Sequence, residues 1–294
     1  MSTLTASVPL EVTLPVPTAR FVIVHYHVFK NGGSTIESIL RREFGPDFAT
    51  VHGPHAGSTL GARDLASFLR DHPNTLALSS HHLRYPKPSL RNIVVFDCCF
   101  LRHPLDRLHS VYNYLRQTPS FDTLHRRARE LYPREFMQRL VAESPDVVSD
   151  VQVMQLANSG AYTRPAHPND LERAAKVVRE MAIPGVVEMF DESLVAAEYF
   201  LRPAFPGVSL EYVPQNIRRP LAMSIAAREQ RLADLWGAAL YDDVARLNQL
   251  DLELYRRAER EIKRRLDLVP RFEERLDNLR ARCEGLRTAT GVTA

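Results

Sequence analysis

Cysteines and long apolar stretches are both scarce in this chain of 294 residues. It has three cysteines, two of them adjacent as Cys98 and Cys99, so no disulfide framework of the kind found in small secreted domains is expected. No apolar run approaches the roughly 20 residues that a membrane-spanning helix needs. The first residues also lack the basic, apolar and small-residue segments of a secretory signal. These features argue against a disulfide-stapled secreted protein and an integral membrane protein.

Lysine is also rare, which gives each lysine more weight. Of the 38 basic residues only four are lysines, at positions 30, 87, 176 and 263. The net charge of +3 suits anionic ligands but is too small to indicate a nucleic-acid-binding protein. With 45% hydrophobic and 25% charged residues, the chain has the composition of an ordinary globular protein with a full core.

Alternating strand and helix patterns predict one α/β domain with a mainly parallel sheet. We expect three parts: a flexible N-terminal segment over residues 1–19, a ligand-binding domain over 20–222 and C-terminal helices over 223–294. The expected strands are Phe21–Phe29, Thr75–Ser80, Asn92–Leu101 and Ile183–Phe190, with a last short one at Glu211–Val213. The expected helices are Ser34–Phe44, Arg63–Arg70 and a run from Pro104 to about Arg116, and Gly45–Gly61 is expected to be a loop.

The C-terminal helices show a separate pattern. Pro270 must end or kink the helical run, because proline lacks the N–H that a helix interior uses. Beyond it apolar residues recur at alternating steps of four and three: Phe272, Leu276, Leu279, Cys283 and Leu286. Such a stripe either packs back onto the same domain or forms a short coiled-coil seam between two copies, so a homo-oligomer is an open alternative.

The most informative segment runs from Phe21 to Leu40. A buried-strand pattern ends in the turn Lys30-Asn31-Gly32-Gly33, and Ser34 and Thr35 open a helix. The glycines let the backbone approach a ligand closely, and the first N–H groups of a helix have no internal partner. Together with the helix dipole they favour phosphate or sulfate. The segment therefore predicts an anion site.

A second segment, from Phe100 to Arg116, supplies further anion-binding groups. Arg102 follows a continuous apolar strand, so it lies at the carboxyl end of the sheet, where open α/β sheets bind ligands. Pro104 suits the first turn of the helix that follows. Arg107 and Ser110 are three residues apart and share one helix face, where guanidinium and hydroxyl groups can hold a phosphate.

These two segments resemble the motifs of the sulfotransferases that use 3′-phosphoadenosine 5′-phosphosulfate (PAPS). The first resembles the 5′-phosphosulfate loop P-K-[TS]-[GA]-[GS]-[ST]-[ST], with Phe29 in place of the proline. The second resembles the 3′-phosphate motif RxPxxRxxSxY. The resemblance implies a three-layer, P-loop-like α/β fold with a C-terminal helical extension. It also implies donor contacts from Lys30, Asn31, Gly32, Gly33, Ser34, Thr35, Arg102, Ser110 and Arg218.

Within that family the Tyr112–Arg116 run and the His82–Tyr85 segment look most like the hexuronyl 2-O-sulfotransferase branch. The resemblance implies a carbohydrate or glycoconjugate acceptor and in-line sulfuryl transfer, with His82 as general base and Lys30 as a catalytic cation. At the position of a second functional histidine of that branch, this sequence has Ser80. His81 and Glu37 remain alternative bases. Relatives of the animal Golgi carry a membrane anchor that this sequence lacks, so the expected location is a bacterial cytoplasm.

Other functions remain as alternatives. The histidines His25, His27, His52, His55, His81 and His82 could compose a metal site, but carboxylate and cysteine partners at ligand spacing are missing and sulfuryl transfer needs no metal. We expect His25 or His27 to line the acceptor cleft instead. A P-loop kinase would place its lysine after the glycines and would hold a metal ion with an acidic residue at the end of a strand. Here the lysine comes first, and Asp97 lies within the expected strand and not at its end. An aryl or peptidyl acceptor, and a non-enzymatic binding protein, also remain open.

Overall fold

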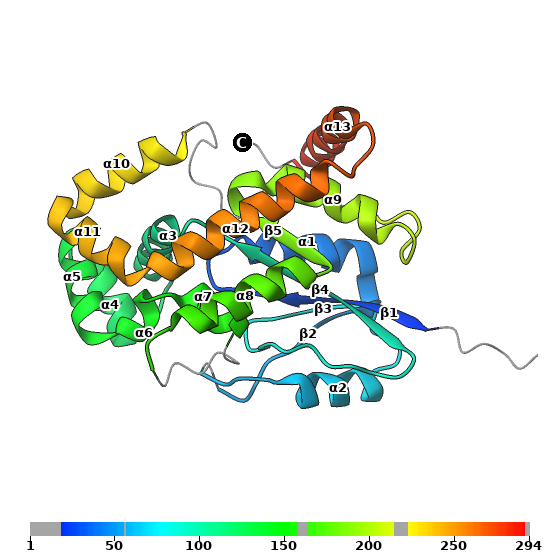
Figure 1. Ribbon diagram of the computed structural model, residues 1–294, viewed down its shortest axis with the longest axis horizontal. Coiled ribbons are helices and arrows are strands. Elements are labelled where there is room, and N and C mark those ends of the chain that lie inside the picture. Colours follow the sequence, from blue (N-terminus) through cyan, green and yellow to red (C-terminus); the bar gives the residue numbers. More distant parts are fainter. Residues whose placement is uncertain (1–18, 56, 158–163, 215–222, 292–294) are drawn as a thin grey trace, which may run out of the picture.

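A computed structural model describes residues 19–55, 57–157, 164–214 and 223–291 (Figure 1). The predicted N-terminal segment therefore lies, except for Ala19, outside the described residues. The described chain contains a five-stranded sheet in the order β2-β3-β1-β4-β5, and every neighbouring pair is parallel. The strands are β1 (Arg20–Tyr26), β2 (Phe48–Thr50), β3 (Ala77–Ser80), β4 (Ile93–Leu101) and β5 (Ile183–Val186).

The central strands are buried on both faces, as the apolar runs predict. In β1, Val22, Val24 and Tyr26 belong to one core cluster, and Ile23 belongs to the cluster on the other face. In β4, Val95 and Cys99 face the first cluster, while Cys98 and Phe100 face the second. This two-sided burial requires helices on both faces, which gives the three-layer α/β architecture.

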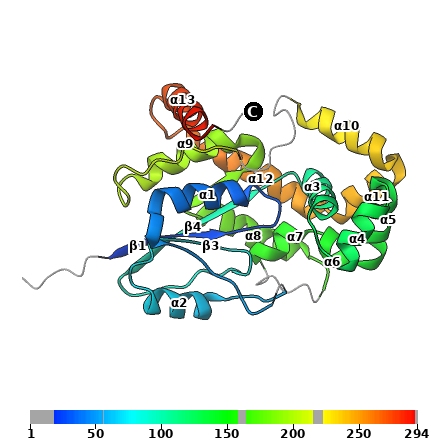
Figure 2. The same ribbon diagram turned by 180° about the vertical axis from the view of Figure 1, so that it is seen from behind.

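Helices fill the two outer layers and also form a group at one end of the sheet (Figures 1 and 2). The α-helices before β5 are α1 (Gly33–Phe44), α2 (Ala62–Asp71), α3 (Pro104–Gln117), α4 (Thr123–Glu130), α5 (Pro133–Glu143), α6 (Pro145–Val148), α7 (Val151–Ala157) and α8 (Pro168–Glu180). Those after it are α9 (Phe190–Leu201), α10 (Ile225–Trp236), α11 (Ala238–Leu247), α12 (Gln249–Leu266) and α13 (Phe272–Thr290). Short 3₁₀ turns occupy Gly45–Asp47 and Val187–Met189. None of the described helices combines the length and apolar character that crossing a membrane requires.

The core clusters show which helices cover which part of the sheet. Helices α1, α9 and α13 pack on one face, and α2, α8 and α12 pack on the other. Helices α3, α4, α5, α10 and α11 form a third cluster around Trp236 and Phe136. This helical group lies at the left in Figure 1, opposite the end where β1 begins. It therefore stands beside the carboxyl ends of the strands, where a ligand site is expected.

Three predicted elements differ from the structure. The strand predicted over Ile183–Phe190 ends at Val186, and the next residues turn into a 3₁₀ turn and α9. The Gly45–Gly61 region is not only loop, because Phe48–Thr50 pairs with β3 as an edge strand too short to show alternation. The strand predicted at Glu211–Val213 is absent, since these residues lie outside the sheet and Tyr212 donates its N–H to Sγ of Cys283.

The apolar stripe of the last helix packs on the chain itself. Leu276, Leu279 and Cys283 of α13 are buried in the cluster that also contains Leu194 and Val195 of α9. On the polar side, Arg282 donates to the carboxylate of Glu198 at 2.8 Å. Of the two alternatives for this stripe, the described residues therefore follow internal packing.

Two distant helices cap each other at their N-termini. Asp150 accepts hydrogen bonds from the N–H groups of Leu250 and Asp251 in α12, at 3.0 and 2.9 Å. Asp251 accepts in turn from the N–H groups of Gln152 and Val153 in α7, at 3.0 and 2.7 Å. Each aspartate thus satisfies donors that a helix leaves unpaired. The exchange fixes α7 against α12 across almost a hundred residues of sequence.

Because the two carboxylates lie close together, the stability of the folded protein depends on pH. Burial and the charge of Asp251 raise the pKa of Asp150 to about 7. The folded protein then keeps a proton that the unfolded chain, with an aspartate pKa of about 3.9, has already released. This contribution to stability is complete below pH ~4 and is lost as the pH rises through 7. We predict that the free energy of unfolding falls by up to about 1.4 kcal/mol per pH unit between pH 5 and 7 from this group.

Asp150→Asn tests this prediction. The amide oxygen can still accept the two N–H bonds, and asparagine tolerates the positive φ of 45° at this position. We expect a flatter dependence of the unfolding free energy on pH, with a gain at pH 8, in urea titrations at pH 5 to 8. The exposed Asp146→Asn is the matched control and should follow the wild-type curve. Parallel curves for Asp150→Asn and wild type would contradict the assignment.

Candidate anion-binding and catalytic site

The predicted anion loop connects the end of β1 to the start of α1. Lys30 and Gly32 both have positive φ, 68° and 73°, so the chain turns sharply before the helix begins at Gly33. The N–H groups of Asn31, Thr35 and Ile36 bond to carbonyls of the loop itself. Within the described residues, those of Gly32, Gly33 and Ser34 donate to no protein acceptor, and the first turn of α1 contains no acidic side chain. These donors form the anion site that the sequence predicts.

Gly33 is required because the ring of His27 lies directly beneath it. A Cβ atom built on Gly33 would lie 1.9 Å from Cδ2 and Nε2 of His27. The ring is buried and stacks on His25 with 5.0 Å between centroids. No side chain larger than hydrogen therefore fits at the first residue of α1 unless the histidine moves.

The Gln152 side chain holds the loop against the end of β4. Its Oε1 accepts from Nδ2 of Asn31 at 2.7 Å and from the N–H of Arg102 at 3.0 Å. Its Nε2 donates to the carbonyl of Arg102 at 2.9 Å. Asn31 also donates to the carbonyl of Phe100 at 2.9 Å. Asn31 was predicted to contact the donor, but its buried amide points inward and positions the loop.

Arg102 lies beside this loop, as the sequence predicts. Its Nη1 donates to the carbonyl of Lys30 at 3.1 Å, which brings the two predicted motifs together at the carboxyl edge of the sheet. The guanidinium is also close to the carboxylates of Glu188 and Asp106, which counteract the lowering of its pKa by burial. Arg228 of α10 pairs with Asp106 at 2.7 Å and with Glu188 at 3.4 Å. Two arginines and two carboxylates therefore share this corner of the site.

The other residues predicted to bind the 3′-phosphate differ in where their side chains lie. Ser110 is partly exposed on α3. Arg107 is buried, and its Nη2 donates to the carbonyl of Val147 at 3.3 Å, beside the charge of Asp251. The prediction that Arg107 and Ser110 hold one phosphate together is therefore wrong for Arg107, because its guanidinium faces the interior. Arg218 lies outside the described residues.

Aromatic rings surround the Lys30 ammonium group. Nζ lies 4.6 Å from the ring centroid of Tyr114 and 5.8 Å from that of Phe29. These two rings meet edge to face at 5.2 Å, and each is more than a third exposed. A cation held over aromatic faces by electrostatic attraction is placed at the mouth of the site.

The histidines form a stack that continues from the core to this mouth. His25 and His27 are buried, and burial lowers the pKa of His25 to about 3 and that of His27 further. Both are neutral core residues, so the prediction that one of them lines the acceptor cleft is wrong. The ring of His81 lies over that of His27 at 3.6 Å and meets Phe29 at 6.2 Å. His81 is only partly buried and is the outermost ring of the stack.

His81 and its neighbour His82 have opposite hydrogen-bonding arrangements. Nδ1 of His81 lies 3.1 Å from the carbonyl oxygen of His27. Nδ1 of His82 accepts from the N–H of Gly53 at 2.6 Å, and its ring meets that of His52 at 5.8 Å. The two rings thus leave β3 in different directions, His81 toward β1 and the anion loop, and His82 toward the loop that follows β2.

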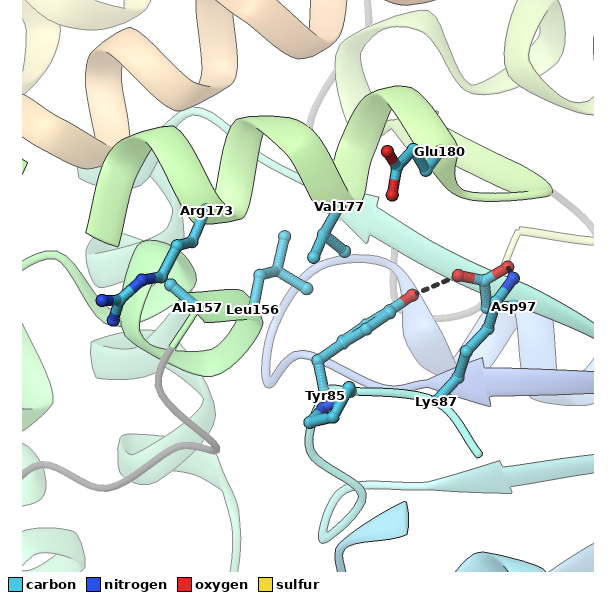
Figure 3. A pocket seen from close by; sticks show the side chains of 9 residues that line it. Tyr85, Lys87, Asp97, Leu156, Ala157, Arg173, Val177 and Glu180 are labelled. Atoms are coloured by element: carbon cyan, nitrogen blue, oxygen red, sulfur yellow. Dashed lines mark hydrogen bonds and ion pairs between the residues drawn. The ribbon is translucent and has the colours of Figure 1, made fainter. Parts of the chain in front are cut away.

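A polar clamp anchors the segment that follows these histidines (Figure 3). Asp97 is buried in the middle of β4 and accepts from the hydroxyl of Tyr85 at 2.9 Å, from Nζ of Lys87 at 2.7 Å and from the N–H of Ala182 at 3.0 Å. Around it is a cavity of about 260 Å³ whose other walls include Leu156, Ala157, Arg173, Val177 and Glu180. The clamp ties the Tyr85–Lys87 turn to the sheet, so it also fixes the histidine-bearing strand end.

Several of these partners were not predicted from the sequence. Gln152 and Arg228 act across long sequence separations. The Asp97 clamp joins Tyr85 and Lys87, 12 and 10 positions away, to Ala182, 85 positions away. No short motif marks any of these contacts. No group of three or more histidine, cysteine, aspartate or glutamate side chains suited to hold a metal ion occurs within residues 19–55, 57–157, 164–214 and 223–291.

Comparison with known proteins gives a relative without an assigned activity. No protein-family model matches the chain. An uncharacterized protein of Archaeoglobus fulgidus is 26% identical over 242 residues, which cover 80% of this chain and 95% of the relative. The name of this relative states no activity, so the likeness adds no functional information.

Gly33→Ala should disrupt the loop because its Cβ cannot coexist with the buried His27 ring. We predict a lower melting temperature and a loss of anion affinity, measured by thermal unfolding with and without adenosine 3′,5′-bisphosphate. Gly285→Ala in α13 is the matched control, since nothing lies within 4 Å of its Cβ position. It should raise stability by about 0.5–1 kcal/mol through helix propensity. Equal behaviour of the two variants would refute the steric explanation.

Asp97→Ala should destabilise the fold by about 3 kcal/mol, because it leaves the Tyr85 hydroxyl and the Lys87 ammonium without their buried partner. Chemical denaturation measures this change. Glu180→Ala removes a carboxylate that α8 contributes to the lining of the same cavity, where the side chain is 66% exposed, and should stay within about 0.5 kcal/mol of wild type. A loss at Asp97 no larger than that at Glu180 would show that the clamp contributes nothing.

Proposed function

We propose that this protein is a PAPS-dependent sulfotransferase that transfers a sulfuryl group to a hydroxyl of a carbohydrate or glycoconjugate. One observation carries the proposal: Arg102 donates to the carbonyl of Lys30 at 3.1 Å. The segment with the order Lys-Asn-Gly-Gly-Ser-Thr and the segment with the order Arg-x-Pro-x-x-Arg-x-x-Ser thus meet at the edge where parallel α/β sheets bind ligands. A donor with phosphate groups at both ends of a ribose needs two such anion sites close together.

The loop supplies groups suited to the reacting end of such a donor. The N–H groups of Gly32, Gly33 and Ser34 and the dipole of α1 favour the charge that develops on the leaving phosphate. Lys30 is the cation nearest to them along the chain and brings a mobile ammonium group. Arg102, Ser110 and Arg218 are proposed for the 3′-phosphate. Arg228, the second guanidinium beside Arg102, is proposed to contribute to the same site.

The geometry disfavours a nucleotide-triphosphate kinase. That class places a lysine after the glycines and coordinates magnesium through a serine or threonine and an acidic residue. Here Lys30 precedes the glycines. Asp97 is buried within β4 and already bonded to Tyr85 and Lys87. It cannot reach a metal ion at the end of the strand.

The acceptor class rests on the resemblance of the Tyr112–Arg116 run and on the rings at the mouth of the site. Phe29 and Tyr114 offer exposed aromatic faces beside Lys30. Such rings suit the apolar face of a sugar ring, and they also suit an aryl group. An aryl or peptidyl acceptor is therefore the alternative that an acceptor panel must separate.

Lys30→Ala tests the enzyme assignment. We predict a loss of about 10²- to 10³-fold in transfer of label from ³⁵S-PAPS, since a charge-stabilising group is removed from the transition state. Folding should be unchanged, because the ammonium sits at the partly exposed mouth of the site. The control is Lys176→Ala, whose side chain is 65% exposed on α8, and it should transfer label at the wild-type rate.

The same assay separates the alternatives. Wild type should bind adenosine 3′,5′-bisphosphate more tightly than ATP in calorimetry, and should label cell-wall glycan fractions rather than a phenol such as 2-naphthol. Preference for ATP would favour the kinase. Tight binding of the bisphosphate without transfer to any acceptor would favour a binding protein. Unchanged transfer by Lys30→Ala would remove Lys30 from the mechanism.

A further inference from the structure

We propose that His81, and not its neighbour His82, is the general base that takes the proton of the acceptor hydroxyl. The proposal rests on the sulfotransferase function proposed above and deepens it. It follows from the hydrogen bond that each ring makes at Nδ1, because that bond decides which nitrogen of the neutral ring has a lone pair.

The bond of His81 leaves a basic nitrogen available. A carbonyl oxygen only accepts hydrogen bonds, so Nδ1 of His81 must carry the proton that it shares with the His27 carbonyl at 3.1 Å. The lone pair of the neutral ring is then on Nε2. A histidine held in this way is oriented as a base, since its orienting bond becomes stronger when Nε2 gains a proton.

The bond of His82 has the opposite effect. A backbone N–H only donates, so Nδ1 of His82 must carry the lone pair that accepts from Gly53 at 2.6 Å. The neutral ring then has its proton on Nε2. For Nε2 of His82 to act as a base, the ring proton would have to be on Nδ1, where it would face the N–H of Gly53. The neutral ring is thus arranged to donate a hydrogen bond from Nε2.

Position also favours His81. Its ring lies over His27 and meets Phe29, which adjoins Lys30. His82 faces His52 and Gly53, in the loop after β2. Arg84 fixes the main chain between them, because its Nη1 donates to the carbonyl of His81 at 2.6 Å. The outermost ring of the stack is therefore the one turned toward the anion loop.

The surroundings keep His81 neutral at physiological pH. Burial lowers its pKa, and the bond to His27 and the charge of Glu37 oppose this lowering. The other titratable or charged groups that act on or contact it are His25 of β1, His27 just after β1, His52 and His82 from their loops, and Arg84, which bonds to its carbonyl. Lys30 acts on His27 beneath it. Glu37 also pairs with Arg41 at 3.0 Å. Its role is to stabilise the imidazolium that forms, not to take the proton itself.

The proposed step balances as follows. The acceptor O–H bond breaks and its proton goes to Nε2 of His81, while the acceptor oxygen forms a bond to sulfur. The bond from sulfur to the 5′-phosphate oxygen of PAPS breaks, and that oxygen keeps the electron pair beside Lys30. The products are the sulfate ester and adenosine 3′,5′-bisphosphate, and the imidazolium then releases its proton to water.

The variants His81→Asn and His82→Asn form a matched pair. Asparagine places an amide near Nδ1 that can donate to the His27 carbonyl or accept from Gly53, while nothing replaces Nε2. We expect His81→Asn to lower transfer from ³⁵S-PAPS by at least about 100-fold, the usual contribution of a general base. We expect His82→Asn to transfer at close to the wild-type rate. Both should bind adenosine 3′,5′-bisphosphate as wild type does.

A second measurement does not depend on the acceptor. Nitrogen-15 NMR of histidine-labelled wild type, with signals assigned from the two variants, should show protonated Nδ1 for His81 and protonated Nε2 for His82. Full transfer by His81→Asn, a loss confined to His82→Asn, or the reverse pair of tautomers would overturn this proposal and leave the sulfotransferase assignment standing. A wild type that neither binds the bisphosphate nor transfers label would end the sulfotransferase assignment and this proposal with it.

Discussion

The amide of Gln152 is the contact on which the arrangement of the site depends. Through three hydrogen bonds it joins the anion loop at Asn31 to the backbone of Arg102. Its own backbone N–H is held by Asp251, which is anchored in α12. A single side chain thus connects the second residue of the loop, the end of a central strand and the N-termini of two helices. A buried amide with all of these partners satisfied is rigid, because losing any one bond leaves a desolvated polar atom.

Charge is distributed unevenly around this connection. On the side of α3 and α10, Arg102 and Arg228 are balanced by Asp106 and Glu188. On the side of β1 and β3, the stacked histidines are neutral, since burial lowers the pKa of each that lies in the core. The Lys30 ammonium, over the Tyr114 ring, lies between these two regions. The positive potential that would attract an anion therefore originates mainly from Lys30 and the start of α1.

The parts predictable from sequence are those governed by local chemistry. The apolar runs of β1, β3 and β4, the glycine turn and the proline at the start of α3 depend on residues close together in the chain, and each was predicted within a few residues of its observed bounds. The parallel sheet followed from their alternation, whereas the three-layer arrangement was expected only from the resemblance to a known family. Phe48–Thr50 was missed because three residues show no periodicity, and Val187–Phe190 was assigned to a strand because its apolar run continues into a helix.

The candidate site was only partly predictable, for a physical reason. Which way a side chain faces depends on packing between distant segments, and sequence spacing does not give it. Arg107 was expected to hold a phosphate together with Ser110, but its guanidinium is held inside by the carbonyl of Val147 and the charge of Asp251. Asn31 was expected to touch a ligand and instead bonds to Gln152, more than a hundred positions away. His81 and His82 are equivalent by composition, and only their partners Gly53 and His27 distinguish them.

The single tryptophan of the chain lies outside the two core clusters that cover the sheet. Trp236 is buried at the end of α10, among the apolar side chains of the helical group that stands at the carboxyl ends of the strands. Its intrinsic fluorescence therefore reports on that group alone, while the far-ultraviolet circular dichroism reports on the whole chain. Comparing the two signals during unfolding would reveal whether the wall beside the anion loop comes apart before the scaffold that carries it.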